Sequence, residues 1–354
     1  MIGVEVAALA FVRRHPTPRA FLATVSAGIL VTITSGLCLG SFDYGTSYFV
    51  SLGMIASGIF IHGLIVMVGG WYLLRNEHKV AARISLGCAL TLVWIAVQAF
   101  AIEPTWLEVT TYRVETDKLT RPVKIAVIAD IQTDHIGAYE RRAISQAVNA
   151  KPDLILWPGD FVQHSDLNVN RELRLRLNSL LRDAGMSAPL GVHAVRGNSE
   201  MSGWPEIFAG LDAELYESSH AVERGELSIT GLSFFDTFET GLEVDRPTDE
   251  RFHLVFGHAP DFALGDVDAD LMIAGHTHGG QVQLPFLGPL LTLSAVSREW
   301  ASDRTDLDDG RTLIVSRGVG LEREGAPRLR FLCRPQLVFI ELVPAPQSTA
   351  RQDG

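Results

Sequence analysis

The first hundred residues alternate between long apolar runs and short, more polar segments. Residues 20–42, 48–74 and 84–102 contain no Asp, Glu, Lys or Arg. A helix of about 20 residues crosses a hydrocarbon core of about 30 Å, so each run is long enough or nearly long enough to span a membrane. Three such runs in succession predict a transmembrane module over residues 1–104 and disfavour buried helices of a soluble domain.

Beyond residue 104 the apolar segments become short and are separated by amphipathic stretches. Residues 139–149 and 171–182 have the apolar spacing of helices, and the second of these carries Leu173, Leu177 and Leu181 on one face. Strand-like segments alternate with these helices up to about residue 225, which predicts an α/β layer. The region 226–342 is rich in strand-like segments and predicts a second sheet. The segments that matter for function are residues 123–129, 153–158, 192–196, 253–256 and 271–274.

Each of these five segments runs directly into metal-binding types of side chain. Open α/β sheets place ligands at the carboxyl ends of their strands, and carboxylates, amides and neutral imidazoles all bind divalent metals. Glycines at these ends allow the backbone to turn sharply. In chain order the five blocks are Asp130-Ile131-Gln132, Gly159-Asp160, Gly197-Asn198-Ser199-Glu200, Gly257-His258 and Gly275-His276-Thr277-His278.

This series of blocks resembles the calcineurin-like metallophosphoesterases. The pattern of that family is Asp-x-His, Gly-Asp-x-x-Asp, Gly-Asn-His-Asp/Glu, a single His and Gly-His-x-His. The resemblance covers about residues 105–343, and the later stretches 315–320 and 330–335 are similar to its membrane-anchored bacterial branch. It implies an α/β fold, a two-sheet sandwich flanked by helices, for residues 105–343. Residues 344–354 are expected to be a disordered tail.

The resemblance also implies a site for two divalent metal ions, of Mn, Fe, Zn or Co. The first ion would be held by Asp130, Gln132, Asp160 and His278, and the second by Asp160, Asn198, His258 and His276. Asp160 would bridge the two ions. By the same resemblance Asp160, Asn198 and His276 are expected to take part in catalysis. Two ions about 3.5–4 Å apart hold the phosphoryl oxygens and make a bound water acidic.

Three positions depart from the family pattern. Gln163 stands where the family has the second Asp of Gly-Asp-x-x-Asp, and this change is expected to be minor, since it removes at most an indirect contact with the site. Gln132 stands where the family has a ligand His, and it either binds the first metal through its amide oxygen or only hydrogen-bonds beside it. Ser199 stands where the family has the His that assists the leaving group. Three outcomes follow: the substrate has a good leaving group, another imidazole (His135, His164 or His220) replaces it, or catalysis is weak. Ser199, Glu200 and His164 are therefore possible accessory residues.

The basic residues of the loops predict the orientation of the chain in the membrane. Arg13, Arg14 and Arg19 precede the first apolar run, and Arg75, Lys79 and Arg83 lie between the second and the third. Residues 41–47 contain neither Lys nor Arg. Positive loops remain in the cytoplasm, so the N-terminus is expected inside and, after three crossings, the catalytic domain outside the inner (plasma) membrane.

The net charge and the predicted membrane spans limit the expected partners. The net charge of −11 disfavours nucleic acid as a partner, because nucleic-acid binding depends on basic contacts. The expected partners are the lipid bilayer and a phosphorylated lipid or small-molecule substrate. The apolar stretch 284–291 is either core or a lip that contacts lipid.

The leading hypothesis is a membrane-anchored, metal-dependent phosphoesterase. It would hydrolyse a phosphate monoester, diester or diphosphate, lipid or lipid-linked, with metal-activated water. The alternatives are a catalytically weak metal-binding membrane protein that recognises a phosphorylated ligand, and a nucleotide-linked diacyl sugar diphosphatase if the domain is cytoplasmic.

Overall fold

The computed structural model describes residues 2–40, 46–247 and 250–346. The chain divides into two compact units. The first contains Met1–Ile102 together with the short segment Glu322–Leu329, and the second contains Glu103–Leu321 and Arg330–Gly354. Most of the tail expected at residues 344–354 lies outside the described residues.

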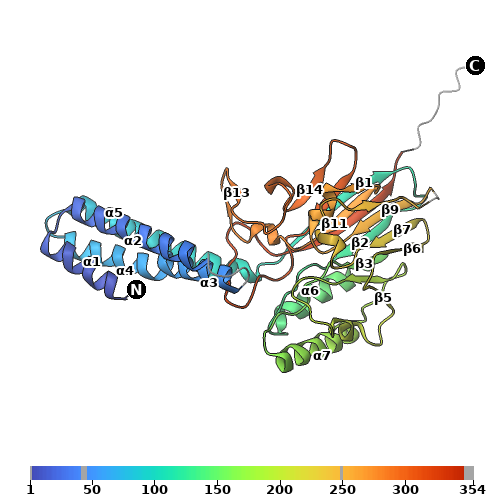
Figure 1. Cartoon of the computed structure of the whole chain (residues 1–354), viewed down its shortest axis with the longest axis horizontal. Helices are drawn as coiled ribbons and strands as arrows, with labels where there is room; N and C mark the ends of the chain where they lie inside the picture. The colour runs from blue at the N-terminus through green and yellow to red at the C-terminus, as the bar shows by residue number, and fades with distance from the viewer. Residues whose placement is uncertain (1, 41–45, 248–249, 347–354) are drawn as a thin grey trace, which may run out of the picture. The chain divides into compact units, whose positions relative to one another are not determined.

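Apart from Glu322–Leu329, the described residues of the first unit are mostly helical (Figure 1). Three of its helices are long and apolar enough to cross a membrane, over Pro18–Ser35, Phe49–Leu74 and Lys79–Thr105, which agrees with the three runs predicted from the sequence. An additional helix, α1, was not predicted, and its 13 residues are too few to span the hydrocarbon core. The helices are α1 (Ile2–Arg14), α2 (Pro18–Gly40), α3 (Thr46–Ser57), α4 (Gly63–Leu74) and α5 (Lys79–Val97), with π-helical turns at Gly58–His62 and Gln98–Ile102.

Glycines allow close helix contacts within this unit. A Cβ atom on Gly58 would lie 2.3 Å from the side chain of Thr32, and one on Gly70 would lie 2.2 Å from the ring of Phe21. Small residues at such points let helices approach and gain van der Waals contact where no hydrophobic driving force acts between them.

The second unit contains two six-stranded sheets (Figure 1). The first has the order β1-β16-β2-β3-β4-β5, and the second has the order β14-β15-β11-β9-β7-β6. The strands of the first sheet are β1 (Glu108–Thr116), β2 (Val123–Val127), β3 (Leu154–Trp157), β4 (Val192–Val195), β5 (Ala213–Tyr216) and β16 (Gln336–Pro344). Those of the second are β6 (His220–Arg224), β7 (Leu227–Gly231), β9 (Phe252–Phe256), β11 (Leu271–Ala274), β14 (Asp303–Asp306) and β15 (Thr312–Val315).

The remaining elements are short or lie outside the two sheets. Helix α7 begins where the Asp166 carboxylate accepts hydrogen bonds from the N–H groups of Asn168 and Val169. The helices are α6 (Ala138–Asn149) and α7 (Leu167–Asp183). The two-stranded pairs are β8 (Glu243–Val244) with β10 (Asp266–Val267) and β12 (Gln283–Leu284) with β13 (Gly288–Pro289). Single 3₁₀ turns occur at Glu103–Thr105, Trp204–Phe208, Asp236–Phe238, Pro260–Leu264, His278–Gly280 and Arg298–Trp300.

The two sheets pack face to face, and helices cover the outer face of the first. Ile125 and Leu156 point into the core between the sheets, where they join Leu254 and Ile273 from the second sheet. Their neighbours along each strand point the other way, since side chains alternate across a strand. On the outer face, Ala126, Ile155 and Trp157 pack with residues of α6 and α7. The sandwich flanked by helices predicted for this region is thus confirmed.

The topology brings five strand ends to one edge of the sandwich. Strands β2, β3 and β4 are parallel neighbours, and so are β9 and β11. Parallel neighbours end at the same edge, so the segments that follow them meet there.

Candidate metal centre

The candidate ligands leave the strand ends in an unusual backbone conformation. Asp130, Gln132, Asp160, His276 and His278 all have positive φ, between 37° and 69°. L-residues other than glycine rarely adopt this region, and such strain is concentrated at functional sites. The tight turns direct all five side chains inward, and each is buried or partly buried.

Glycines next to these residues allow the loops to approach one another. A Cβ atom on Gly275 would lie 2.4 Å from Oδ2 of Asp130, and one on Gly197 would lie 2.1 Å from Oδ1 of Asp160. Any side chain at either position would push a candidate carboxylate ligand away. The glycines of the Gly-His-x-His and Gly-Asn blocks therefore have a steric role in the site.

Two imidazoles present lone pairs to each other. His258 Nδ1 is 2.7 Å from the carbonyl of Pro158, and His276 Nε2 is 3.1 Å from the carbonyl of Leu293. A carbonyl only accepts, so both of these nitrogens carry the proton, and the other nitrogen of each ring has a free lone pair. These two unprotonated nitrogens are 3.1 Å apart. Burial lowers the pKa of both histidines to about 4, so both are neutral near pH 7.

Further acceptors complete this cluster. Asn198 Oδ1 lies 2.7 Å from His258 Nε2, and Asp160 Oδ1 lies 3.6 Å from the same nitrogen. Four acceptor atoms therefore converge with no proton between them. Such an arrangement is repulsive unless a cation occupies it, and this donor set of imidazoles, amide and carboxylate suits a divalent transition metal. The residues of the second predicted metal site thus fit the ion.

The carboxylates of the first predicted site lie beside this cluster. Ligand atoms of Asp130, Asp160 and His278 lie within 4.8 Å of one another, and all three residues are buried. Burial raises the pKa of Asp130 well above its usual value, and the negative charge of Asp160 raises it further. Burial also raises the pKa of Asp160 to about 6. A bound cation would relieve both effects, so these carboxylates also fit a metal.

His278 differs from the other two histidines. Its Nδ1 lies 3.1 Å from Nη2 of the buried Arg330, which can only donate. The proton of neutral His278 is therefore on Nε2, and it is donated to Oε1 of Gln132. A metal-binding histidine usually donates its second ring N–H to an acceptor, so the first site is less prepared for an ion than the second.

Glu200 connects the loops that hold Asp160 and Asn198. Its carboxylate accepts hydrogen bonds from the backbone N–H groups of Asp160 (2.9 Å), Phe161 (2.6 Å) and Gly197 (2.7 Å). The Ser199 hydroxyl donates to the same carboxylate at 3.0 Å, and the Ser199 N–H donates to Asp160 Oδ1 at 2.8 Å. Ser199 therefore supports the framework of the site.

Two of the three imidazoles considered as substitutes for the missing histidine have ring contacts elsewhere. His164 Nδ1 accepts from the N–H of Asp166 at 3.1 Å, and His220 Nε2 is 3.3 Å from Glu214. The hydrogen bonds between His135 and the Thr133 hydroxyl are made by the His135 backbone, not by its ring. Across residues 2–40, 46–247 and 250–346, no hydrogen bond given by the structure joins any of these rings to a candidate ligand.

Sequence reasoning missed several residues of the site. Arg330 lies in a stretch noted only for its resemblance to the membrane-anchored branch, and Gln163 was considered unimportant. The ring of Phe238 lies 5.2 Å from that of His276, at a right angle to it. Phe238 also contacts the ring of Phe234, and the Arg196 guanidinium stacks on Phe234 at 4.8 Å. These residues form an aromatic wall beside the second predicted metal site. No sequence motif marks them.

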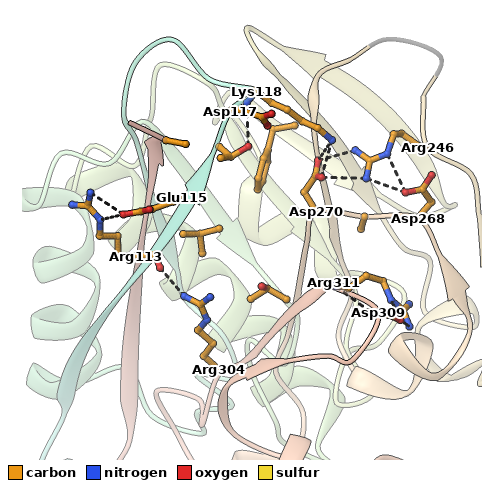
Figure 2. A pocket seen from close by; sticks show the side chains of 17 residues that line it. Arg113, Glu115, Asp117, Lys118, Arg246, Asp268, Asp270, Arg304, Asp309 and Arg311 are labelled. Carbon is orange, nitrogen blue, oxygen red and sulfur yellow. Dashed lines mark hydrogen bonds and ion pairs between the residues drawn. The ribbon is translucent and has the colours of Figure 1, made fainter. Parts of the chain in front are cut away.

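A cavity lies at the opposite strand ends. It has a volume of about 860 Å³ and is lined by the first residues of β9 and β15 and by Asp270, which precedes β11 (Figure 2). Its cations are matched by carboxylates: Lys118 and Arg246 both contact Asp270 at 2.7 Å, and Arg311 contacts Asp309 at 2.6 Å. It contains none of the candidate metal ligands, which lie in the buried centre at the other strand ends.

The chain is similar to known phosphoesterases. Residues 123–280 match the family model of the calcineurin-like phosphoesterases. The chain is 26% identical over 260 residues to an uncharacterised metallophosphoesterase of Bacillus subtilis, YkuE, a match that covers 68% of this chain and 87% of that protein. It is 27% identical to the phosphodiesterase YaeI of Escherichia coli, over 68% and 90% of the two chains. It is 22% identical to the UDP-2,3-diacylglucosamine pyrophosphatase LpxG of Chlamydia trachomatis, over 73% and 94%.

Proposed function

We propose that this phosphoric ester hydrolase, whose residues 123–280 match the family model of the calcineurin-like phosphoesterases, cleaves a phosphodiester or diphosphate at a centre for two divalent metals. The observation that carries the proposal is the convergence of His258 Nε2, His276 Nδ1 and Asn198 Oδ1 as acceptors with no proton between them. A divalent cation would satisfy all three atoms at once.

Each residue has a defined task in this proposal. Asp130, Gln132, Asp160 and His278 would hold the first ion, and Asp160, Asn198, His258 and His276 would hold the second. A bound pair of divalent ions supplies an acidified water and an electrostatic clamp on the phosphoryl oxygens. The chain keeps these ligands in place through the carbonyls of Pro158 and Leu293, which orient the two imidazoles, and through Glu200, which joins two ligand loops.

The state of Ser199 indicates the kind of leaving group. Its hydroxyl donates to Glu200, and it does not titrate near pH 7, so it does not protonate a departing alkoxide. A diphosphate or an activated ester leaves without that help. The pyrophosphatase name of the chlamydial relative and the phosphodiesterase name of the E. coli relative fit this substrate class.

The apolar helices favour a lipid or lipid-linked substrate at a bilayer. Three helices are long and apolar enough to cross, and the Lys/Arg distribution of their loops gives a cytoplasmic N-terminus and an extracytoplasmic catalytic domain at the inner membrane. A nucleotide-linked diacyl sugar diphosphate is the alternative substrate if the domain is cytoplasmic. Gln132 and Ser199 support a second alternative, a weak enzyme that mainly binds a phosphorylated ligand.

The experiment that tests the proposal replaces Asp160. Purified Asp160→Asn should lose hydrolysis of an aryl phosphodiester and should hold less metal in both sites, because the bridging carboxylate is removed. His276→Ala should mainly empty the second site. Asp166→Asn is the matched control, since this carboxylate of the same loop region caps α7. Two metals per chain and normal activity in Asp160→Asn would show that the assignment is wrong.

A further inference from the structure

A short apolar hairpin projects beside the metal centre. Strands β12 and β13 pair antiparallel, and the N–H of Leu287 donates to the carbonyl of Leu284 to close the turn. The Phe286 side chain at the tip is fully exposed, and that of Leu287 is 63% exposed. Phe286 has a φ of 69°, a conformation unfavourable for an aromatic residue. An apolar side chain is thus exposed at the tip of the hairpin, on a residue whose backbone conformation is strained.

The exposed apolar surface extends beyond the tip. Leu290, Leu291 and Leu293 are each between 42% and 53% exposed. We call residues 284–293 the apolar hairpin. Residues 281–297 contain no Asp, Glu, Lys or Arg, although the whole chain has a net charge of −11. A contiguous, uncharged and exposed apolar surface marks a contact with a partner or a membrane.

The apolar hairpin is fixed to a candidate ligand. The carbonyl of Leu293 accepts from His276 Nε2 at 3.1 Å. At the other side, a Cβ atom on Gly280 would lie 2.6 Å from both Pro289 Cβ and the carbonyl of Leu291, so the loop with the His-x-His pair packs tightly against the hairpin. Whatever the hairpin contacts is therefore held at a set position relative to the metal centre.

The chain itself indicates what this contact is. The last candidate span ends at Thr105 and β1 begins at Glu108, so only two residues connect them and a bilayer is always within reach of the catalytic domain. A tether this short replaces a bimolecular encounter with an intramolecular one. A protruding tip of Phe and Leu enters a lipid phase without needing a shaped cavity, whereas a protein partner must provide a complementary pocket.

We propose that the apolar hairpin inserts into the interfacial layer of the bilayer. Aromatic and leucine side chains are the types that proteins bury at this depth. The insertion itself does not depend on the proposed hydrolysis. The consequence of the insertion rests on the proposed hydrolysis. The metal centre would then act on phosphate groups at the level of the lipid headgroups, while the acyl chain of the substrate stays in the membrane.

The test uses the full chain in phosphatidylcholine/phosphatidylglycerol vesicles. In a Cys38→Ala, Cys88→Ala background, which keeps the buried Cys333, an environment-sensitive fluorophore is attached at Leu287→Cys. Leu167→Cys at the start of α7 is the matched control, because Leu167 is 67% exposed. The Leu287 label should lose most of its emission to a quencher carried on lipid chains and resist aqueous iodide. The Leu167 label should show the opposite behaviour.

Two results would overturn the proposal. One is equal iodide quenching of the Leu287 and Leu167 labels in vesicles. The other is self-quenching of the Leu287 label in detergent that grows with protein concentration, which would identify a second copy of the chain as the occupant. Both measurements are independent of activity, so they remain decisive if the proposed hydrolysis fails.

An activity measurement then tests the consequence. Phe286→Ser combined with Leu287→Ser should lower the ratio of hydrolysis of a vesicle-embedded diacyl diphosphate to that of a soluble aryl phosphodiester several-fold. Leu167→Ser should leave this ratio unchanged. An unchanged ratio in the double variant would show that the hairpin does not position the site.

Discussion

The side-chain amide of Gln132 donates to Oε1 of Gln163 at 3.2 Å, which leaves Oε1 of Gln132 facing His278. These two glutamines occupy the positions at which the related pattern has a ligand His and the second Asp of Gly-Asp-x-x-Asp. Both residues of this contacting pair differ from the family pattern. An amide–amide hydrogen bond joins two positions that hold His and Asp in that pattern. The replacement of one residue is thus accommodated by the other.

Restoring the pair should strengthen the first metal site. Gln132→His with Gln163→Asp places an imidazole lone pair toward the ion and a carboxylate behind the second ring N–H, which increases ligand basicity. Metal content after exhaustive dialysis should rise toward two ions per chain. Gln132→His alone should give a smaller gain. Equal metal content in the wild type and the double variant would contradict the role of Gln132 as a weak ligand.

Ser199→His tests the missing acid. If leaving-group protonation limits the rate, this variant should speed hydrolysis of alkyl phosphates and have little effect on activated aryl esters, with a pH dependence near the imidazole pKa of about 6.5. Ser199→Ala is the control, because it removes only the hydroxyl that donates to Glu200. Equal changes for both substrates, or losses in both with metal intact, would refute the missing-acid explanation.

His193 should make the fold sensitive to acid. Its Nε2 donates to the carbonyl of Leu190 and its Nδ1 accepts from the Tyr216 hydroxyl, and burial lowers its pKa from 6.5 to about 4. The folded state therefore resists protonation. Stability is fully present above pH 6.5 and is lost as the pH falls toward 4, by roughly 3 kcal/mol in total.

Thermal melting of the detergent-solubilised chain between pH 7.5 and 4 measures this loss. His193→Gln cannot titrate and should be less stable at pH 7.5 but should lose less on acidification. His220→Gln, at the start of strand β6 in the second sheet, should keep the acid sensitivity of the wild type. Parallel pH profiles for the wild type and His193→Gln would exclude His193 as the cause.

The orientation in the membrane is tested by fusions after Ile102. An alkaline phosphatase fused there should be active and a fluorescent protein should be dark, because three crossings from a cytoplasmic N-terminus end outside. A bright fluorescent fusion would indicate an even number of crossings. It would also bring the nucleotide-linked diacyl sugar diphosphate to first place among the substrates.

Local patterns predicted the parts of the site that depend on neighbours in sequence. Five apolar segments that end at glycines or small polar residues identified the strand ends, because burial and turn formation leave a direct trace in the residue order. Arg330 and the Leu293 carbonyl were missed, since both reach the site through contacts between distant segments. A backbone carbonyl carries no side-chain signal at all.

The helical unit shows the same limit. Length and hydropathy predicted its three long helices, which depend only on a continuous apolar stretch. The grouping of Glu322–Leu329 with this unit has no counterpart in the local sequence. Helix α1 was not predicted, because its 13 residues are too few to form a candidate span.

The left-handed conformations at Asp130, Gln132, Asp160, His276 and His278 have an evolutionary consequence. Each costs about 1–2 kcal/mol relative to an ordinary backbone, in a molecule whose whole stability is on the order of 5–15 kcal/mol. Glycine at any of these positions would relax the chain, so random drift would readily fix it in a lineage that no longer needed the centre. Non-glycine residues are therefore expected to persist at these positions only while selection for the centre outweighs the cost in stability.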